Sequence, residues 1–248
     1  MCGVVVIATR WWLAWLLVSV ACLMALLGAN LSPSWLLAPP YDDHSAEADL
    51  LKGSSSPGQS VLCSDGTRVT GATGCQPVDE RPSIGLWIRC VFMKAYLKPA
   101  LHCGVYATRV SDLPPAQVAS LVAVVAATAI TTLTCFAIFS ATCVRVIRGR
   151  SWFTTIGTIQ AVAGVLSLLG AAIFPLGWDS FRVRSMCGDD AGFYYPSACT
   201  VGWAMYAVLG GSLGLLLCTC LATFSAKSTA TDRVSNEIAK GNQVVCLI

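Results

Sequence analysis

The sequence predicts a membrane protein: an all-α bundle of four transmembrane helices with a small, disulfide-pinned extracellular β-sheet. Three observations predict this fold. Hydrophobic residues make up 55% of the 248 residues and charged residues only 12%, about half the charged fraction of an average soluble domain. Four long runs contain no charged residue and no histidine, and each exceeds the roughly 20 residues that cross a bilayer. Six cysteines fall in the two longer segments, 32–112 and 177–200, that separate the expected spans.

The charge-free runs set the order of the elements along the chain. They cover residues 11–41, 113–144, 151–178 and 191–226. From them we expect transmembrane spans at 11–31, 115–141, 154–176 and 201–225. The remaining segments are then an N-terminus at 1–10, a first loop at 32–112, a link at 145–150, a second loop at 177–200 and a tail at 226–248.

Basic residues indicate which segments face the cytosol. The N-terminus, the link and the tail together hold seven basic and two acidic residues, whereas the two loops hold nine basic and eleven acidic residues. Short segments rich in Lys and Arg stay in the cytosol. Arg182 and Arg184, in the second loop, count mildly against this orientation. We therefore expect a multi-pass protein of the plasma membrane with both termini in the cytosol and both loops outside.

Cysteine positions agree with this orientation. The two loops contain an even number of cysteines, namely Cys63, Cys75, Cys90, Cys103, Cys187 and Cys199. Cysteines in an oxidising compartment are typical of disulfides, and six of them allow fifteen pairings. Of the other cysteines, Cys2, Cys143 and Cys246 are candidates for S-palmitoylation. A buried, unmodified thiol is an equally good interpretation of each.

The long first loop is expected to form a folded structure and not an unstructured linker. An insertion at about 42–80 begins with a polar Ser/Gly/Pro segment, and its VLCSDGTRVTGATGC stretch has a hairpin signal at Asp65-Gly66. The segments SIGLWIRCVF and LHCGVYATRV are further strand candidates. We expect a small sheet that lies on the membrane. Asn30-Leu31-Ser32 matches the N-glycosylation sequon but abuts the first span, so we expect it to be unmodified.

The chemical inventory favours neither catalysis nor transport. The only two histidines, His44 and His102, have no metal-ligand spacing, and no nucleotide-binding, hydrolase or metalloprotease motif occurs. No ionisable residue occupies the centre of a span, where a pump or transporter generally needs one. We therefore expect no enzyme activity, no cofactor and no metal. The net charge of +3 gives no reason to expect nucleic-acid binding.

Small residues in the spans point to close helix packing. Gly210 and Gly214 form a GxxxG pair in the fourth span, a pattern that lets helix backbones approach closely in lipid. Packing within the four-helix bundle is the ordinary interpretation. The sharper one is a face for a homo-oligomer or for another membrane protein.

The loops resemble those of a known family. Trp35, Gly85-Leu86-Trp87, Cys90 and Cys103 resemble the W…GLW…C…C signature of the claudin-like tetraspan superfamily. The segment FPLGWDSFRVRSMCGDDAGFYYPSACTVGWAMYA resembles the lipoma HMGIC fusion partner-like (LHFPL) tetraspan family. The amino end MCGVVVI and the tail NEIAKGNQVVCLI are most similar to the second member of that family.

This resemblance implies pairings and a role. It implies the disulfides Cys90–Cys103 and Cys187–Cys199, which leave Cys63 and Cys75 as the third pair. Trp35, Gly85, Leu86 and Trp87 would anchor the extracellular fold. For Trp87 the alternative is an exposed contact for a partner.

The resemblance also implies a non-catalytic auxiliary or scaffold subunit that lies in the lipid bilayer. Such a subunit binds a membrane protein of the receptor or channel class and helps to assemble or traffic it. A claudin-like protein of cell–cell adhesion or barrier formation is the alternative, and a channel in its own right is a third reading.

Overall fold

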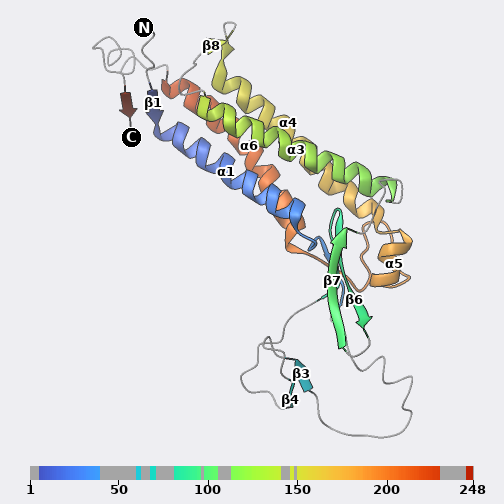
Figure 1. The fold of residues 1–248 in the computed structure, drawn as a ribbon. Helices are drawn as coiled ribbons and strands as arrows, with labels where there is room; N and C mark the ends of the chain where they lie inside the picture. The colour runs from blue at the N-terminus through green and yellow to red at the C-terminus, as the bar shows by residue number, and fades with distance from the viewer. Residues whose placement is uncertain are drawn as a thin grey trace, which may run out of the picture.

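Four long helices form a bundle in the computed structural model (Figure 1). They are α1 (Arg10–Leu31), α3 (Pro115–Ser140), α4 (Trp152–Ile173) and α6 (Trp203–Thr229). Each is long enough and apolar enough to cross a membrane. The structure describes residues 6–39, 60–62, 68–70, 81–95, 98–105, 113–140, 146–147, 150–229 and 244–247.

The helices begin and end for local reasons. Thr9 precedes α1 in an extended conformation, and its Oγ1 accepts a hydrogen bond from the Trp12 backbone N–H at 3.2 Å. Helix α3 starts at Pro115. Proline is favoured at this first position, because a backbone N–H there would have no hydrogen-bond partner within the helix. Helix α4 gives way to the short 3-10 helix η2 (Phe174–Gly177), which has Pro175 near its start.

The region around the fourth span differs most from the predicted ranges. Thr200–Val201 is strand β10, so α6 begins only at Trp203 instead of at 201. The helix also continues past 225 to Thr229, with Lys227 in the last turn, where a cation interacts favourably with the helix dipole. The second loop contains a helix that its predicted range does not anticipate, α5 (Phe181–Cys187). The other three helices begin and end within three residues of their predicted spans.

Small residues lie where the helices touch. Helix α6 packs against both α1 and α4, and α4 packs against α3, whereas α1 and α3 share a smaller contact. A Cβ atom added at Gly157 would lie 2.6 Å from the Ala222 Cβ, and one added at Gly170 would lie 2.7 Å from the Val124 Cγ2. A larger residue does not fit at either place. Glycine therefore permits the close approach of α4 to α6 and to α3.

Polar side chains inside the bundle are hydrogen-bonded to one another. The Nε1 of Trp15 donates to the Oε1 of Gln160 at 2.8 Å, and the Nε2 of Gln160 donates to the Oγ of Ser19 at 2.9 Å. Gln160 is fully buried. Ser167 of α4 and Ser212 of α6 share a hydrogen bond of 2.5 Å. Because lipid offers no hydrogen-bond partners, such pairs hold helices together at membrane depth.

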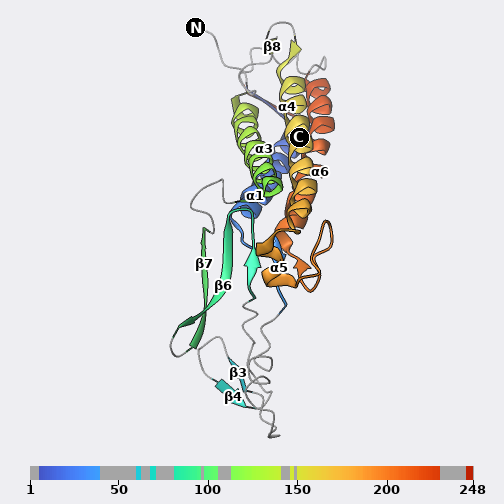
Figure 2. The same cartoon turned by 90° about the vertical axis from the view of Figure 1, so that its right-hand side faces the viewer.

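A five-stranded antiparallel sheet covers one end of the bundle, which we call the sheet end (Figures 1 and 2). Its strand order is β10-β2-β5-β6-β7. The strands from the first loop are β2 (Leu36–Leu37), β5 (Ser83–Ile84), β6 (Ile88–Ala95) and β7 (Lys98–Val105). Strand β10 comes from the second loop, so the sheet joins both loops.

Three two-stranded pairs complete the described structure. Strands β3 (Ser60–Leu62) and β4 (Arg68–Thr70) pair antiparallel on either side of the predicted hairpin turn at Asp65-Gly66, which lies outside the described residues. Strands β8 (Val146–Ile147) and β9 (Arg150–Ser151) pair antiparallel in the link. Strands β1 (Val6–Thr9) and β11 (Val244–Leu247) pair in parallel. This last pair brings the two ends of the chain together.

The sheet and the bundle share one hydrophobic core. Buried residues of the sheet region, among them Trp35, Leu36 and Leu86, belong to the same cluster as Phe174 of η2 and Val208 of α6. Burial of apolar surface, at about 25 cal/mol per Å², therefore couples the sheet to the helices. The sheet is built onto the bundle and is not a separate domain on a linker.

Candidate interaction site at the sheet end

Trp35 fastens the sheet to two helices. Its side chain is fully buried, and its Nε1 donates a hydrogen bond to the carbonyl oxygen of Ala29, in α1, at 2.8 Å. Its ring centroid lies 4.9 Å from that of Phe174. An aromatic pair of this kind adds about 0.5–1.5 kcal/mol to the burial of the rings themselves. Strand β2 thus starts from a fixed point on the bundle.

Gly85, Leu86 and Trp87 form the tight connection between β5 and β6. A Cβ atom added at Gly85 would lie 2.6 Å from the carbonyl oxygen of Ser32 and 2.9 Å from the Pro33 Cα, so only glycine fits against this turn. Leu86 is fully buried. The Nε2 of Gln117, in the first turn of α3, donates to the carbonyl oxygens of Gly85 and Leu86 at 3.3 and 3.4 Å. The connection is therefore tied to α3 as well.

The Trp87 side chain is hydrogen-bonded to the fold and also partly exposed. Its Nε1 donates to the carbonyl oxygen of Asn30 at 2.8 Å, which holds the side chain at the end of α1. Its side chain is nevertheless 40% exposed. Asn30 itself is buried, and its Nδ2 donates to the Oγ1 of Thr128 at 2.7 Å. The amide of the glycosylation sequon is thus engaged inside the fold.

Two disulfides brace this end of the molecule. Cys90 and Cys103 are direct cross-strand partners in β6 and β7, and they are bonded to each other. Cys187, the last residue of α5, is bonded to Cys199, which immediately precedes β10. Disulfides that close loops of this length typically stabilise by about 2–4 kcal/mol. Cys63 and Cys75 lie outside the described residues.

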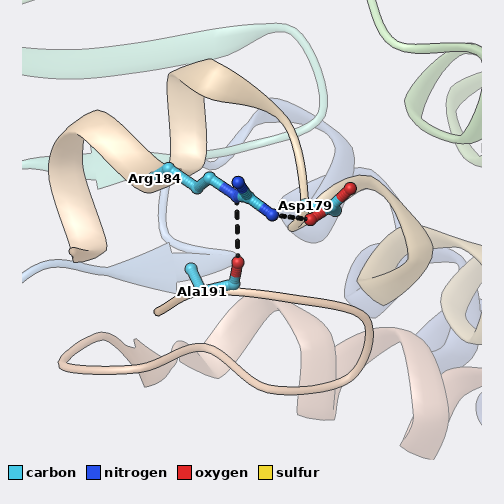
Figure 3. A network of polar contacts seen from close by, with 3 residues as sticks. All are labelled: Asp179, Arg184 and Ala191. Carbon is cyan, nitrogen blue, oxygen red and sulfur yellow. Dashed lines mark hydrogen bonds and ion pairs between the residues drawn. The ribbon is translucent and has the colours of Figure 1, made fainter. Parts of the chain in front are cut away.

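Polar contacts connect parts of the second loop to one another and to α4 (Figure 3). The guanidinium of Arg184, on α5, forms an ion pair with Asp179 and donates from Nε to the carbonyl oxygen of Ala191 at 3.2 Å. The hydroxyl of Tyr194 donates to the carbonyl oxygen of Ala172, in α4, at 2.7 Å. Arg184 counted against the predicted topology when charge alone was considered; here it organises the loop.

Aromatic side chains of the second loop point away from the core. Phe181 is 85% exposed and Phe193 is 65% exposed, and Tyr194 and Tyr195 are exposed to a similar degree as Phe193. We call these four residues the aromatic rim. The FYY run was visible in the sequence, but its exposure depends on how α5 and the disulfide position the loop. Aromatic residues are enriched at protein–protein interfaces, which makes the rim the strongest candidate contact surface here.

The remaining predicted residues fall in different surroundings. Gly214 packs against the Sγ of Cys22, so α6 and α1 meet there within one chain, whereas nothing lies within 4 Å of a Cβ atom added at Gly210. Of the GxxxG pair, Gly214 thus lies at a contact within the bundle and Gly210 lies on the outer surface. Cys2 and Cys143 lie outside the described residues, and only the backbone of Cys246, in β11, is described. Palmitoylation of these three stays a prediction.

The described residues offer a binding surface and no evident reaction centre. Within them, no group of three or more His, Cys, Asp or Glu side chains lies close enough to hold a metal ion. What the site presents is a braced sheet, an ordered second loop and the exposed aromatic rim. Such an arrangement can bind another macromolecule.

Comparison with known proteins agrees with the fold. The family model "Lipoma HMGIC fusion partner-like protein" matches residues 11–227. Over the full length of both chains, the protein is 27% identical to LHFPL tetraspan subfamily member 2a protein from Danio rerio and 26% identical to LHFPL tetraspan subfamily member 2 protein from Homo sapiens. It is also 35% identical to LHFPL tetraspan subfamily member 4 protein from Homo sapiens over 85 residues, 34% of each chain. The chain therefore belongs to the LHFPL family of tetraspan membrane proteins.

Proposed function

We propose that this tetraspan protein is a non-catalytic auxiliary or scaffold subunit that binds a partner membrane protein and helps to assemble or traffic it. The partner would be of the receptor or channel class. The observation that carries the proposal is the aromatic rim, which is exposed on a loop that a disulfide, the Arg184–Asp179 pair and the Tyr194 hydroxyl hold in place. A preformed aromatic surface binds with a small ordering cost.

The bundle interior supports the same proposal. Gln160, Ser19, Ser167 and Ser212 are buried and hydrogen-bonded to residues of this chain. Their polar groups are thus used to hold the helices together. This leaves the sheet end and the lipid-facing helix surfaces for contact with a partner.

Affinity purification with a matched pair of variants tests the proposal. The tagged full-length chain is crosslinked in native tissue, extracted in a mild detergent, and compared with Phe181→Ser/Tyr195→Ser and with Phe136→Ala, which alters an exposed aromatic residue of α3. We expect the rim variant to lose a co-purifying membrane protein at least tenfold, because aromatic anchors carry much of the binding energy of an interface. The α3 variant should retain it. Equal recovery from all three proteins would contradict the role of the rim.

A second candidate, claudin-like adhesion or barrier formation, is favoured by the shape of the sheet. The β6–β7 hairpin projects from the bundle (Figure 1), and β7 is an end strand in the order of the described sheet. An adhesion protein should concentrate at contacts between otherwise non-adherent cells that express it and should change paracellular conductance. An auxiliary subunit should do neither. Currents from the protein reconstituted alone would support the channel reading instead.

The orientation is part of this proposal. We propose that the sheet end lies outside the cell at the plasma membrane and that both termini lie in the cytosol. The parallel pairing of β1 with β11 and the even number of spans support a common side for the two termini. An epitope inserted near Ser55 should then bind antibody on intact cells, whereas one placed after Ile248 should bind only after permeabilisation. The opposite labelling would reverse the orientation.

A further inference from the structure

Two cations and two aromatic side chains form an exposed patch at the end of the bundle away from the sheet. Arg10 and Trp11 come from the start of α1, and Phe224 and Lys227 come from the last turns of α6. All four side chains are exposed. In Figure 1 the start of α1 and the end of α6 lie together at this end. We call these four residues the basic-aromatic patch.

The aromatic pair of the patch joins the two helices on their outer surface. The ring centroids of Trp11 and Phe224 lie 5.2 Å apart, and the rings are stacked at an angle of 29°. Next to this pair, the hydroxyls of Thr9 and Ser228 share a hydrogen bond of 3.0 Å. Both contacts fix the start of α1 against the end of α6. The patch is therefore a feature of the packed bundle and not of one helix alone.

One cation adjoins each ring of the pair. The guanidinium carbon of Arg10 lies 5.8 Å from the centroid of the Trp11 ring, which is within the range of a cation–π interaction. A guanidinium above a ring still presents N–H donors along its edge. Lys227 follows Phe224 by three residues, so both lie on the same side of α6. Each helix thus contributes one aromatic ring and one positive charge.

The position of Arg10 in its helix favours an external anion. Arg10 is the first residue of α1, and the first turn of this helix contains no acidic residue. The helix dipole favours negative charge at an N-terminus and positive charge at a C-terminus. Lys227, in the last turn of α6, has the favourable placement. Arg10 has the unfavourable one, and an anion bound beside it would offset that cost.

The Trp11 indole retains hydrogen-bonding capacity. The Nε1 atoms of Trp15 and Trp35 donate to oxygen atoms of the protein. Among the residues that the structure describes, none accepts a hydrogen bond from the Nε1 of Trp11. An exposed indole of this kind is typical of the level where a bilayer meets water. A phosphate or ester oxygen of a lipid can accept its hydrogen bond.

The level of the patch in the bilayer identifies the source of the anion. One candidate span covers Arg10–Leu31 and another covers Trp203–Ser228, so both cations lie where spans end. Lipid headgroups occupy this level, and the patch is positively charged. Anionic headgroups are its electrostatic complement, whereas a choline headgroup carries no net charge. The stacked rings suit the glycerol and the upper acyl chain of the same lipid.

We propose that the basic-aromatic patch binds the headgroup of an anionic phospholipid from the leaflet opposite the sheet. Arg10 and Lys227 contact its negatively charged groups, and the Trp11–Phe224 pair contacts its glycerol and upper acyl chain. The lipid bridges α1 and α6. This inference goes beyond the proposed function and does not rest on it, because it concerns a lipid and not a protein partner.

Native mass spectrometry of the full-length chain tests this site. The protein is purified in dodecyl maltoside and titrated separately with phosphatidylserine and phosphatidylcholine. We expect phosphatidylserine to bind at least about tenfold more tightly, because each Lys or Arg beside an anionic headgroup contributes about a fivefold gain in binding. The double variant Arg10→Gln/Lys227→Gln should reduce this preference to less than about threefold. Equal affinities of the unmodified protein for the two lipids, or an undiminished preference in the double variant, overturn the proposal.

Two control variants separate the patch from charge in general and from misfolding. Arg89→Gln removes a charge from an exposed side chain of β6, at the sheet end, and should keep the full preference. A loss in Arg89→Gln equal to that of the double variant would show that only net charge matters and would overturn the site. The variant Arg10→Lys/Lys227→Arg keeps both charges in place and should keep the preference. Its loss there would overturn the electrostatic basis of the proposal.

A competition arm distinguishes a lipid from a free anion. Glycerophosphoserine, which is the soluble headgroup without acyl chains, should leave the bound phosphatidylserine in place at millimolar concentration. The reason is that it cannot make the contacts proposed for the aromatic pair. Displacement of the lipid at that concentration would identify a site for free anions and overturn the assignment to lipid.

A photocrosslinking arm keeps the proposal testable if the double variant is unstable. The unmodified protein is reconstituted into nanodiscs that contain phosphatidylserine with a diazirine close to its headgroup. Crosslinks should map near Trp11 in α1 and near Phe224 in α6, and a matched phosphatidylcholine probe should give fewer of them. Crosslinks confined to α3, α4 or the sheet end would overturn the proposal. None of these readouts depends on a protein partner, so this inference and the proposed function fail or stand separately.

Discussion

The interior of the bundle and the sheet end are stabilised by different means. In the bundle, glycines such as Gly157 and Gly170 let helices approach, and polar residues such as Gln160 are hydrogen-bonded across them. At the sheet end, disulfides and indole-to-backbone hydrogen bonds from Trp35 and Trp87 fix short strands. The reason is the solvent. Lipid tails are as apolar as leucine, so apolar burial cannot join helices there, whereas strands in water need covalent and aromatic anchors.

Removal of the sheet disulfide should have the largest effect on this comparison. The double variant Cys90→Ala/Cys103→Ala should lower the free energy of unfolding by about 3 kcal/mol, because the bond closes a loop of 13 residues. Thermal unfolding in detergent measures the loss, and surface delivery in cells should fall with it. The control is Cys220→Ala, which alters an exposed free cysteine. Unchanged stability and delivery would mean that the sheet does not depend on this bond.

A substitution at the boundary between the two regions should come next. Gly202 lies between β10 and α6, and a Cβ atom there would lie 2.7 Å from the carbonyl carbon of Ser34. Gly202→Ala should destabilise by about 2 kcal/mol, because the backbone of β10 must move away from β2. The backbone N–H of Gly202 also donates to the Trp35 carbonyl oxygen at 2.9 Å. Amide hydrogen exchange should speed up at this end and leave the middle of α6 protected.

Removal of the buried side-chain amide of Gln160 tests how hydrogen bonds stabilise the interior of the bundle. Gln160→Leu removes the hydrogen bonds to Trp15 and Ser19 and leaves the Trp15 indole N–H without its partner. We expect the free energy of unfolding to fall by about 1.5 kcal/mol, since interhelical hydrogen bonds in membranes contribute only modestly to stability. Ile159→Ala is the control, because Ile159 directly precedes Gln160 on α4 and is exposed on the lipid-facing surface. A leucine variant as stable as the natural protein would show that the hydrogen bonds of Gln160 to α1 do not stabilise the bundle.

Substitutions at the two glycines of the GxxxG pattern should have the smallest effects on the free energy of unfolding, and the two effects should differ from each other. Gly214→Ala should destabilise by about 1 kcal/mol, because the new methyl group meets the Sγ of Cys22 and that thiol must rotate away. Gly210→Ala should change stability by less than about 0.5 kcal/mol, because its Cβ atom meets nothing. If instead Gly210→Ala reduces self-association in detergent, the exposed glycine serves an oligomer interface. Sedimentation of both variants distinguishes these outcomes.

Much of the site could be anticipated, but its assembly could not. The pattern W…GLW…C…C indicated Trp35, Gly85, Leu86 and Trp87 as anchors, and each of them contacts or joins the elements described above. The aromatic rim was not anticipated. It depends on α5, a helix of seven residues within a stretch that reads as a loop. A helix this short has little intrinsic stability and forms only in its tertiary context.

The sequence by itself determined that this chain has four membrane spans and to which family it belongs. Spans are determined locally, because each charge-free run is driven into lipid by its own composition. Only the tertiary structure decided that β10 joins the sheet of the first loop, that Gln160 bonds to Trp15 across 145 residues, and that Gly214 and Gly210 face different surroundings. Those contacts depend on the rotation and depth of whole helices. The rotation and depth of each helix are set by its packing against all of its neighbours, so no single segment of the sequence encodes them.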